Sequence, residues 1–295
     1  MIAPDIALIV CRFLFDAAAI FLWGTSFFLG AVIPARLAQQ IDDRLQTHQR
    51  SAFMVVIAMT GVLLPLQAAT IGDGWNDAVD PATLEAVLFE TNVGQAWMAQ
   101  AVAAALLCGT ALISVSRRQI AMAIAAAMLL ATLAMTGHAA MNSGWSGMLH
   151  RCNDIAHLLS AGAWLGALVP VLIILPMLAS ADLGIAAQQA LTRFSLIGHF
   201  AVAITIGTGL ANTYLVVGGP PLDWSIPYQA LLALKIMLVG AMIVLALINR
   251  YVFVPRLSTD QPRALSALAR GTMAEIVVGI AVIALVAWFG TLDPQ

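Results

Sequence analysis

The chain has 295 residues, of which 61% are hydrophobic and only 9% are charged, and its mean hydropathy is +0.94. A water-soluble domain of this length needs far more charge to cover its surface, so the composition excludes a soluble globular protein. The formal net charge of −2 gives no support to a nucleic-acid partner, and three scattered cysteines make no disulfide framework.

The apolar residues form blocks of about 20, the length that spans a bilayer core as a helix. These blocks are too long and too uniformly apolar for barrel strands, which would alternate. The first block lacks a preceding basic stretch, so we interpret it as a retained helix, not a cleaved signal. We predict an all-α, polytopic integral membrane protein, a bundle of eight transmembrane helices forming a single domain over residues 1–295. The predicted spans are 6–32, 52–71, 95–115, 119–139, 148–178, 193–217, 228–249 and 271–291.

A short internal similarity suggests two parallel halves. "VGQAWMAQAV" opens the third predicted helix and "PYQALLALKI" opens the seventh, both from the same side of the membrane. Repeats of this kind are common in transporters. The similarity is compatible with four-helix halves over 1–140 and 148–295.

The distribution of basic residues predicts the orientation in the membrane, because cytoplasmic connections carry an excess of Lys and Arg. On one side of the predicted bundle, the connections 72–94, 140–147 and 218–227 contain neither Lys nor Arg. Both termini are therefore expected to face outward, which in a bacterium is the periplasm. Ten arginines fall on the predicted inner side: Arg36, Arg44, Arg50, Arg117, Arg118, Arg193, Arg250, Arg256, Arg263 and Arg270.

The outward connection 72–94 contains five acidic residues and no basic one. One interpretation is an acidic entrance that concentrates cations. The other, which we favour, is a solvated loop that simply obeys the positive-inside bias.

Ionisable groups at membrane depth are costly and therefore indicate function or a structural pair. Arg12 and Asp16 are four residues apart and are expected to form an ion pair facing the bundle, structural or on the transport pathway. Lys235 lies about two turns into the seventh helix, where it can neutralise Asp154 or Asp16, or extend to the surface. Glu275 is expected to be structural.

The fifth predicted helix carries the most informative pattern. His150, Asp154 and His157 fall within about 60° of one another on one helical face, whereas Cys152 points away from it. Asp154 is placed to accept a proton from a neighbouring imidazole, which would fix the tautomer of a ligand. The two histidines are separated by about 10 Å along the axis, so one ion is not expected to bind both without ligands from another helix.

The preceding turn supplies further ligands. His138 and Met141 at the outer end of the fourth helix are expected to meet Met148 and His150, and His157 lies deeper. Imidazole suits copper or zinc, and thioether selects copper, especially Cu(I). The alternative is that Met fills the core and that lone histidines form hydrogen bonds between helices. We favour a metal or haem site at His138, Met141, Met148, His150, Asp154 and His157.

Several stretches, in order, resemble the copper resistance protein D family. They are "LFETNVGQAW", "TGHAA", "LHRCNDIAHLLSAGAWLGAL", "RFSLIGHFAVAITIGTGLANTYLVVGG" and "PYQALLALKIMLVGAMIVLALINRYVFVPRL". The resemblance implies a bacterial inner-membrane protein of copper homeostasis that works with a periplasmic chaperone of the CopC family, here a separate protein. It places the family's histidines at His138, His150 and His157, its lysine at Lys235 and its glutamate at Glu275. His199 departs from the pattern.

The sequence is therefore compatible with two alternative functions. The first is copper transport, as Cu(I) or Cu(II), from periplasm to cytoplasm, without enzymatic activity. The sequence has no G-x-x-x-x-G-K-[ST] loop, so transport is expected to be downhill or ion-coupled. The second is electron transfer by haem b, with His157 and His199, or His138 and His150, as axial ligands.

Overall fold

The computed structural model describes residues 3–137 and 144–293, and within them every regular element is helical. Eight of the described helices are long and apolar enough to cross a membrane, in agreement with the predicted number of spans. The main helices are α1 (Pro4–Phe27), α2 (Ala35–Ile71), α3 (Pro81–Glu90), α4 (Asn92–Gly109), α5 (Val115–Thr132), α6 (Gly144–Ile174), α7 (Gly184–Val217), α8 (Pro227–Ile248) and α9 (Gln261–Phe289). Short 3₁₀ or π segments extend several of them: η1 (Phe28–Val32), η2 (Thr110–Leu112), η3 (Leu133–Met135), η5 (Leu175–Ala179), η6 (Asn249–Phe253) and η7 (Pro255–Ser258).

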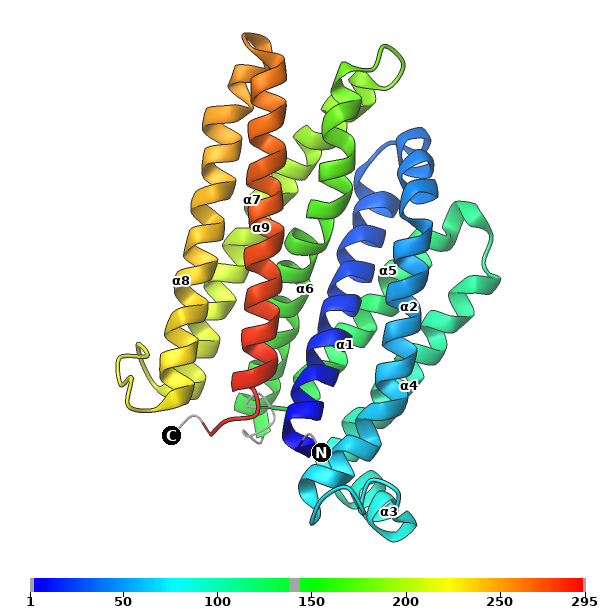
Figure 1. The fold of residues 1–295 in the computed structure, drawn as a ribbon, viewed down its shortest axis with the longest axis vertical. Helices are drawn as coiled ribbons and strands as arrows, with labels where there is room; N and C mark the ends of the chain where they lie inside the picture. Colours follow the sequence, from blue (N-terminus) through cyan, green and yellow to red (C-terminus); the bar gives the residue numbers. More distant parts are fainter. Residues whose placement is uncertain (1–2, 138–143, 294–295) are drawn as a thin grey trace.

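The helices form two neighbouring groups that run along the long axis of the molecule (Figure 1). In one group α1 packs against α2 and α5, and in the other α6 packs against α7 and α8 against α9. Contacts of α1 with α6 and α9 join the groups. Both chain ends and α3 lie at one end of the bundle, which we call the terminus end. The opposite end, which we call the arginine end, holds the α1–α2, α4–α5, α6–α7 and α8–α9 connections.

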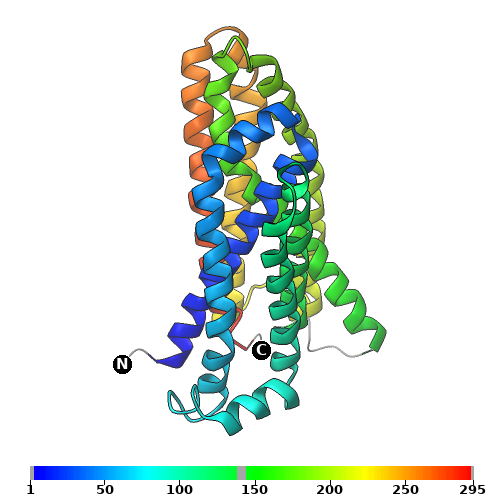
Figure 2. The same cartoon turned by 90° about the vertical axis from the view of Figure 1, so that its right-hand side faces the viewer.

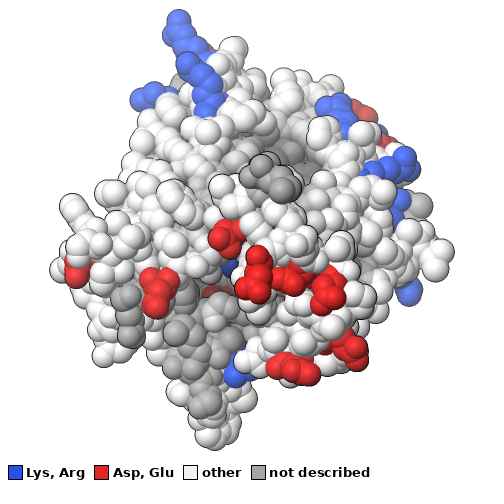
Figure 3. Space-filling model, turned by 60° about the horizontal axis from the view of Figure 1, so that its bottom comes forward, with Lys and Arg blue, Asp and Glu red and all other residues white. Residues whose placement is uncertain are grey.

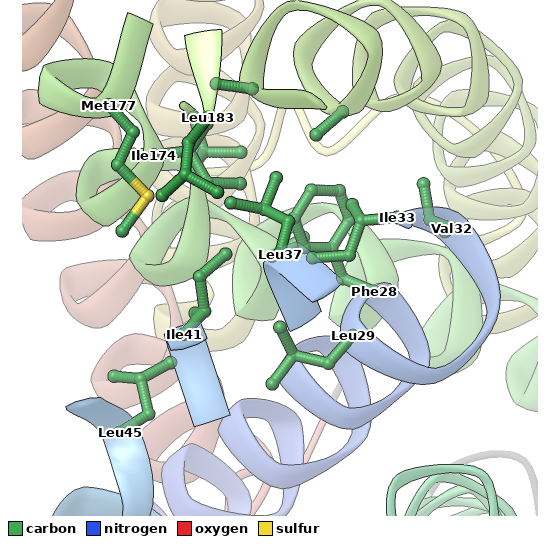
Figure 4. Packing of buried hydrophobic residues seen from close by; sticks show 14 residues of the cluster. Phe28, Leu29, Val32, Ile33, Leu37, Ile41, Leu45, Ile174, Met177 and Leu183 are labelled. Atoms are coloured by element: carbon green, nitrogen blue, oxygen red, sulfur yellow. The ribbon is translucent and has the colours of Figure 1, made fainter. Parts of the chain in front are cut away.

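Three helices begin well before the apolar blocks that marked them in the sequence. The structure starts α2 at Ala35, α7 at Gly184 and α9 at Gln261, where the predicted spans began at 52, 193 and 271. The predicted starts lay too far along the chain because the search looked for apolar runs as long as the bilayer core is thick. Such a search leaves out the polar turns of a helix that projects beyond the bilayer. In α2 these turns are amphipathic, and Leu37, Ile41 and Leu45 are buried against α6 and α7 (Figure 4).

The helix α3 was not predicted from the sequence, which suggested a loop over 72–94. Pro81 begins the helix, and the Asp80 side chain accepts a 2.8 Å hydrogen bond from the Thr83 amide. This arrangement is an N-cap followed by proline at the first helical position. Figure 2 shows α3 lying across the terminus end beneath α2 and α4. Figure 3 shows acidic side chains gathered on this end of the molecule.

The cap makes the order of α3 dependent on pH. Hydrogen bonds from the Thr83 hydroxyl and amide lower the pKa of Asp80. A lowered carboxyl pKa means that the cap stabilises α3 above the ordinary carboxyl pKa, and that this is lost as pH falls through the lowered value. We expect Asp80→Ala to accelerate amide hydrogen exchange over 81–90 at neutral pH. Glu85→Ala, on the exposed side of the same helix, is the control; equal acceleration in both variants would contradict the cap.

Small residues allow α1 and α6 to pack closely, which positions the two groups of helices. A Cβ atom added to Gly24 would lie 2.4 Å from the Gly162 carbonyl oxygen, and one added to Gly166 would lie 2.4 Å from that of Ile20. The Thr25 hydroxyl donates a 3.0 Å hydrogen bond to the Gly166 carbonyl across the same contact. Such small-residue contacts are typical of membrane helices that pack backbone to backbone.

Candidate functional site

A cavity of about 490 Å³ opens among α1, α2, α4, α6, α7, α8 and α9 in the terminus-end half of the bundle, and we call it the terminus-end cavity. Six polar residues singled out in the sequence line it: Arg12, Asp16, His150, Asp154, His157 and Lys235. They come from α1, α6 and α8, which are far apart in the sequence. The structure therefore brings most of the intramembrane charge to one place.

One face of α6 supplies the two histidines of the cavity. His150, Asp154 and His157 recur at intervals of four and three residues, so they follow one helical stripe. His150 is 2% exposed and His157 is partly buried. The spacing along the helix places His157 deeper than His150 by about 10 Å.

Contacts with α7 fix the imidazole of His157. Its Nδ1 atom lies 3.2 Å from the Thr205 carbonyl oxygen and 3.0 Å from the Thr208 hydroxyl. The carbonyl can only accept, and the Thr208 hydroxyl already donates to the Ile204 carbonyl at 2.6 Å. Nδ1 must therefore carry the proton, which leaves the lone pair on Nε2. Second-shell contacts of this kind orient metal-binding histidines.

Asp154 is not the partner of the His157 Nδ1 atom. Its Oδ1 atom accepts a 2.9 Å hydrogen bond from the Asn212 side chain, and Asn212 in turn accepts one from Asn153 at 2.7 Å. The tautomer of His157 is set by α7 and not by Asp154, because the Thr205 carbonyl occupies Nδ1. Asp154 instead interacts electrostatically with Lys235 and His150.

The two basic residues of the cavity are held by the ends of other helices. The Lys235 ammonium lies 5.8 Å from the ring centre of Phe289, a cation–π geometry, and shares the cavity with Asp154. Arg12 donates a 3.4 Å hydrogen bond to the Gly290 carbonyl beyond α9. The expected Arg12–Asp16 contact is absent from the ion pairs formed within 4.0 Å in the described part of the chain. The Gly290 carbonyl attracts the guanidinium instead.

The cavity also contains an acceptor without a partner. Gln100 of α4 is 3% exposed, and its Oε1 atom has no hydrogen-bond donor. An unpaired buried acceptor is costly unless a water molecule or a ligand donates to it or a cation coordinates it. Within residues 3–137 and 144–293, no group of three His, Cys, Asp or Glu side chains is close enough to hold one metal ion. The described cavity thus presents separate ligands and not a completed chelate.

Several predicted residues lie elsewhere or cannot be placed. Met148 is 46% exposed on α6 and does not line the cavity, because it lies on a different face of the helix from His150. Cys152 is also exposed, which agrees with the expectation that it points away. His138 and Met141 lie outside the described residues, so the expected outer layer of ligands is represented here by His150.

A second cavity of about 890 Å³ lies in the other half of the bundle, and we call it the arginine-end cavity. It shares no lining residue with the first. His199 lines it, with its Nε2 atom 3.2 Å from the Tyr251 hydroxyl. His157 and His199 therefore face different cavities, and the structure does not bring this expected haem-ligand pair together. A cluster that includes Trp164, Leu168, Ala201 and Met242 lies beside the arginine-end cavity.

The sequence analysis missed the polar face of α7. Thr205, Thr208 and Asn212 follow a spacing of three and four residues, which places them on one helical stripe. Ser160 of α6 joins this seam through a 2.9 Å hydrogen bond to the Thr205 hydroxyl. The signal was present in the sequence as hydroxyl and amide side chains at helical spacing in an apolar helix.

The Thr208 contact makes a direct prediction about metal affinity. We expect Thr208→Val to lower the affinity of the protein for Cu(I), added as a probe of ligation by His157, by about 10-fold, because a residue that orients a ligand histidine contributes at least this much and the Thr205 carbonyl still holds Nδ1. Thr192→Val is the matched control, because the Thr192 hydroxyl of α7 donates to the Gln188 carbonyl of its own helix and the residue does not line this cavity. Competition with a Cu(I) chelator measures both. Equal losses would indicate a general effect of removing hydroxyls from α7.

Among solved structures, the chain is similar to bd oxidase from Geobacillus thermodenitrificans. The TM-score is 0.54 and the sequence identity is 10%, with 99% of this chain and 88% of the other covered. At this identity the similarity concerns the fold, an arrangement of membrane-spanning helices.

Sequence comparisons are more specific. Residues 1–148 match the model of the copper resistance protein D-like N-terminal domain, and residues 188–289 match that of copper resistance protein D. The chain is 34% identical to the inner membrane protein YebZ of Escherichia coli (strain K12), over 97% of this chain and 98% of the relative. It is 30% identical to copper resistance protein D of Pseudomonas syringae pv. tomato, over 82% and 81%, respectively. It is 29% identical to the copper transport protein CutJ of Bacillus subtilis (strain 168), over 85% of this chain and 47% of that protein. The chain belongs to the copper resistance protein D family.

Proposed function

We propose that the protein transports copper ions across the bacterial inner membrane, from periplasm to cytoplasm, in copper homeostasis. The observation that carries this proposal is His157, whose Nδ1–H is bound by α7 so that Nε2 keeps its lone pair beside a polar cavity. Imidazole is a good ligand for copper. The names of two relatives, copper resistance protein D and copper transport protein CutJ, support copper as the cargo.

The proposed direction, import, uses the orientation that the basic residues predict. With the terminus end in the periplasm, a separate chaperone of the CopC family delivers copper at that end. His150 and the unplaced His138 and Met141 receive the ion, and His157 binds it about 10 Å deeper. Asp154 and Asp16 offset part of its charge, because both carboxylates line the same cavity.

Passage to the other half requires a conformational change. The two cavities share no lining residue, and the apolar cluster around Trp164 lies beside the arginine-end cavity. Transport without a nucleotide-driven step depends on rearrangement of such packed helices about a bound ion. The protein therefore acts as a permease without enzymatic activity, with copper flux downhill or coupled to another ion.

Copper flux into proteoliposomes tests the proposal. The purified protein is reconstituted, and Cu(I) or Cu(II) is added outside while a chelating dye reports copper inside. We expect flux above that of protein-free vesicles, together with copper binding by the protein in detergent. Binding without flux would favour a sensor or chaperone scaffold, and the absence of both would reject copper transport.

An absorption spectrum of the purified protein distinguishes haem b binding from copper transport. The structure places His157 and His199 at different cavities, which gives no support to this ligand pair. A Soret band in the absorption spectrum of the purified protein would restore the electron-transfer hypothesis through other ligands. The absence of a Soret band would reject the electron-transfer hypothesis.

A further inference from the structure

Glu275 is a buried carboxyl group that the proposed route through His157 does not use. It is 3% exposed, lies in α9 and lines the arginine-end cavity. The Asn249 side chain donates a 2.7 Å hydrogen bond to its Oε1 atom, and the Trp164 side chain lies beside it in the same cavity. The sequence suggested a structural role, but the cavity at its side extends to the arginine-end connections, with Ser180 and Ser258 among its lining residues.

Among residues 3–137 and 144–293, no cationic side chain lies within 4.0 Å of this carboxylate. None of the ion pairs within 4.0 Å in the described residues includes Glu275. The other titratable or charged residues that line its cavity are His199 of α7 and Arg250 of η6; α6 and η5 contribute none. His199 is bonded to the Ser195 carbonyl and Tyr251. A buried carboxylate without a cation within ion-pair distance is unfavourable, and binding of a proton removes that cost.

The number of ligands decides between a metal ion and a proton. A metal ion needs several converging oxygen, nitrogen or sulfur ligands, and none of the metal-ligand groups of the described residues meets that need around Glu275. In the orientation that the structure shows, Asn249 presents its N–H₂ group to Glu275, and an N–H donor repels a cation. A proton requires only one carboxylate lone pair. The site therefore suits a proton and not the transported metal.

The Asn249 side chain can form a hydrogen bond with Glu275 in both protonation states of the carboxyl group. Its Nδ2 atom donates to the carboxylate, while its Oδ1 atom is buried and has no hydrogen-bond partner. If the amide turns over, Oδ1 accepts a hydrogen bond from a protonated carboxyl group. Asn249 begins the π segment η6, a distortion that is frequent at functional sites, and it packs against Gly271, where a Cβ atom would lie 2.2 Å from Oδ1.

The helix α6 connects this site to the proposed copper site. Trp164, whose side chain lies beside Glu275, follows His157 by seven residues, two helical turns along α6. A shift or rotation of α6 that alters the His157 site therefore also moves the indole beside Glu275. The two cavities can be coupled in this way without sharing a lining residue.

From this geometry we infer that Glu275, with Asn249 and Trp164, is a proton-binding site that exchanges protons with the arginine-end solution and couples proton movement to transport. The carboxylate takes a proton from hydronium, which leaves water, and the reverse step returns it. The coupling rests on the proposed copper transport, whereas proton binding by Glu275 does not.

The first experiment tests proton binding without copper. Infrared difference spectra of the purified protein, recorded between acidic and alkaline buffers, are compared for wild type, Glu275→Gln and Glu275→Asp. We expect a protonated-carboxyl C=O band that is lost in Glu275→Gln and shifted in Glu275→Asp. Asn249→Leu should displace the pH at which the band appears. An unchanged band in Glu275→Gln would overturn the inference.

The second experiment tests coupling. Copper flux in proteoliposomes is measured with and without an imposed proton gradient. We expect the gradient to change wild-type flux several-fold and to have no effect on Glu275→Gln, with Glu275→Asp partly responsive. Wild-type copper flux that is the same with and without the gradient would contradict the coupling but not copper transport. Failure of all copper flux would reject the proposed function and the coupling together, while the infrared titration would still decide whether Glu275 binds a proton.

Discussion

Replacing His157 by alanine is expected to lower the affinity of the protein for copper by more than about 100-fold and to abolish copper flux. Loss of a second-shell partner costs about 10- to 100-fold in affinity, and loss of the ligand itself should cost more. His157 offers Nε2 to the terminus-end cavity because Thr205 and Thr208 hold Nδ1. The measurement is chelator competition in detergent, followed by flux in proteoliposomes.

Two variants of α6 serve as controls for His157→Ala. Cys152→Ala removes an exposed thiol on another face of α6 and should leave affinity and flux unchanged. Met148→Leu removes a thioether that is 46% exposed and does not line the cavity. If Met148→Leu cost as much affinity as His157→Ala, copper would bind at the surface of α6 and the cavity would not be the site.

Substitution of Gly166 by alanine is expected to destabilise the fold by about 1–3 kcal/mol, the usual cost of overpacking a close contact. The added methyl group would lie 2.4 Å from the Ile20 carbonyl oxygen and 2.8 Å from the Gly24 Cα atom. Both are backbone atoms, so α1 and α6 would have to separate. The separation would also move Arg12 and Asp16 of α1 away from the α6 wall of the cavity. The free energy of unfolding, or the midpoint of thermal unfolding in detergent, measures the effect.

Gly240 provides the matched control for this substitution. It lies within α8, and a Cβ atom there would have nothing within 4 Å. Alanine has a higher helix propensity than glycine, so Gly240→Ala should leave stability unchanged or raise it by up to about 1 kcal/mol. A Gly166→Ala variant as stable as wild type would show that the α1–α6 contact is looser than the structure describes, and equal destabilisation in both variants would show that the loss is not specific to this contact.

The sequence by itself determined the membrane architecture of this protein. Hydropathy found the eight spans because a bilayer requires long apolar helices whose backbone groups are satisfied internally. Helical periodicity placed His150, Asp154 and His157 on one stripe, and these residues share a cavity in the structure. It also turned Cys152 away from that stripe. These are local properties, fixed by the geometry of a single helix.

Only the tertiary structure decided which groups meet. The periodicity of α6 placed Asp154 near two imidazoles, and only the approach of α7 decided that the Thr205 carbonyl and Thr208, and not Asp154, contact Nδ1 of His157. The end of α9 drew Arg12 to the Gly290 carbonyl. The packing of α8 against α9 placed Asn249 beside Glu275 and made a second polar site. Side chains on different helices are brought together by the close packing of backbones such as Gly24 against Gly166, and spacing along one helix carries no information about its neighbours.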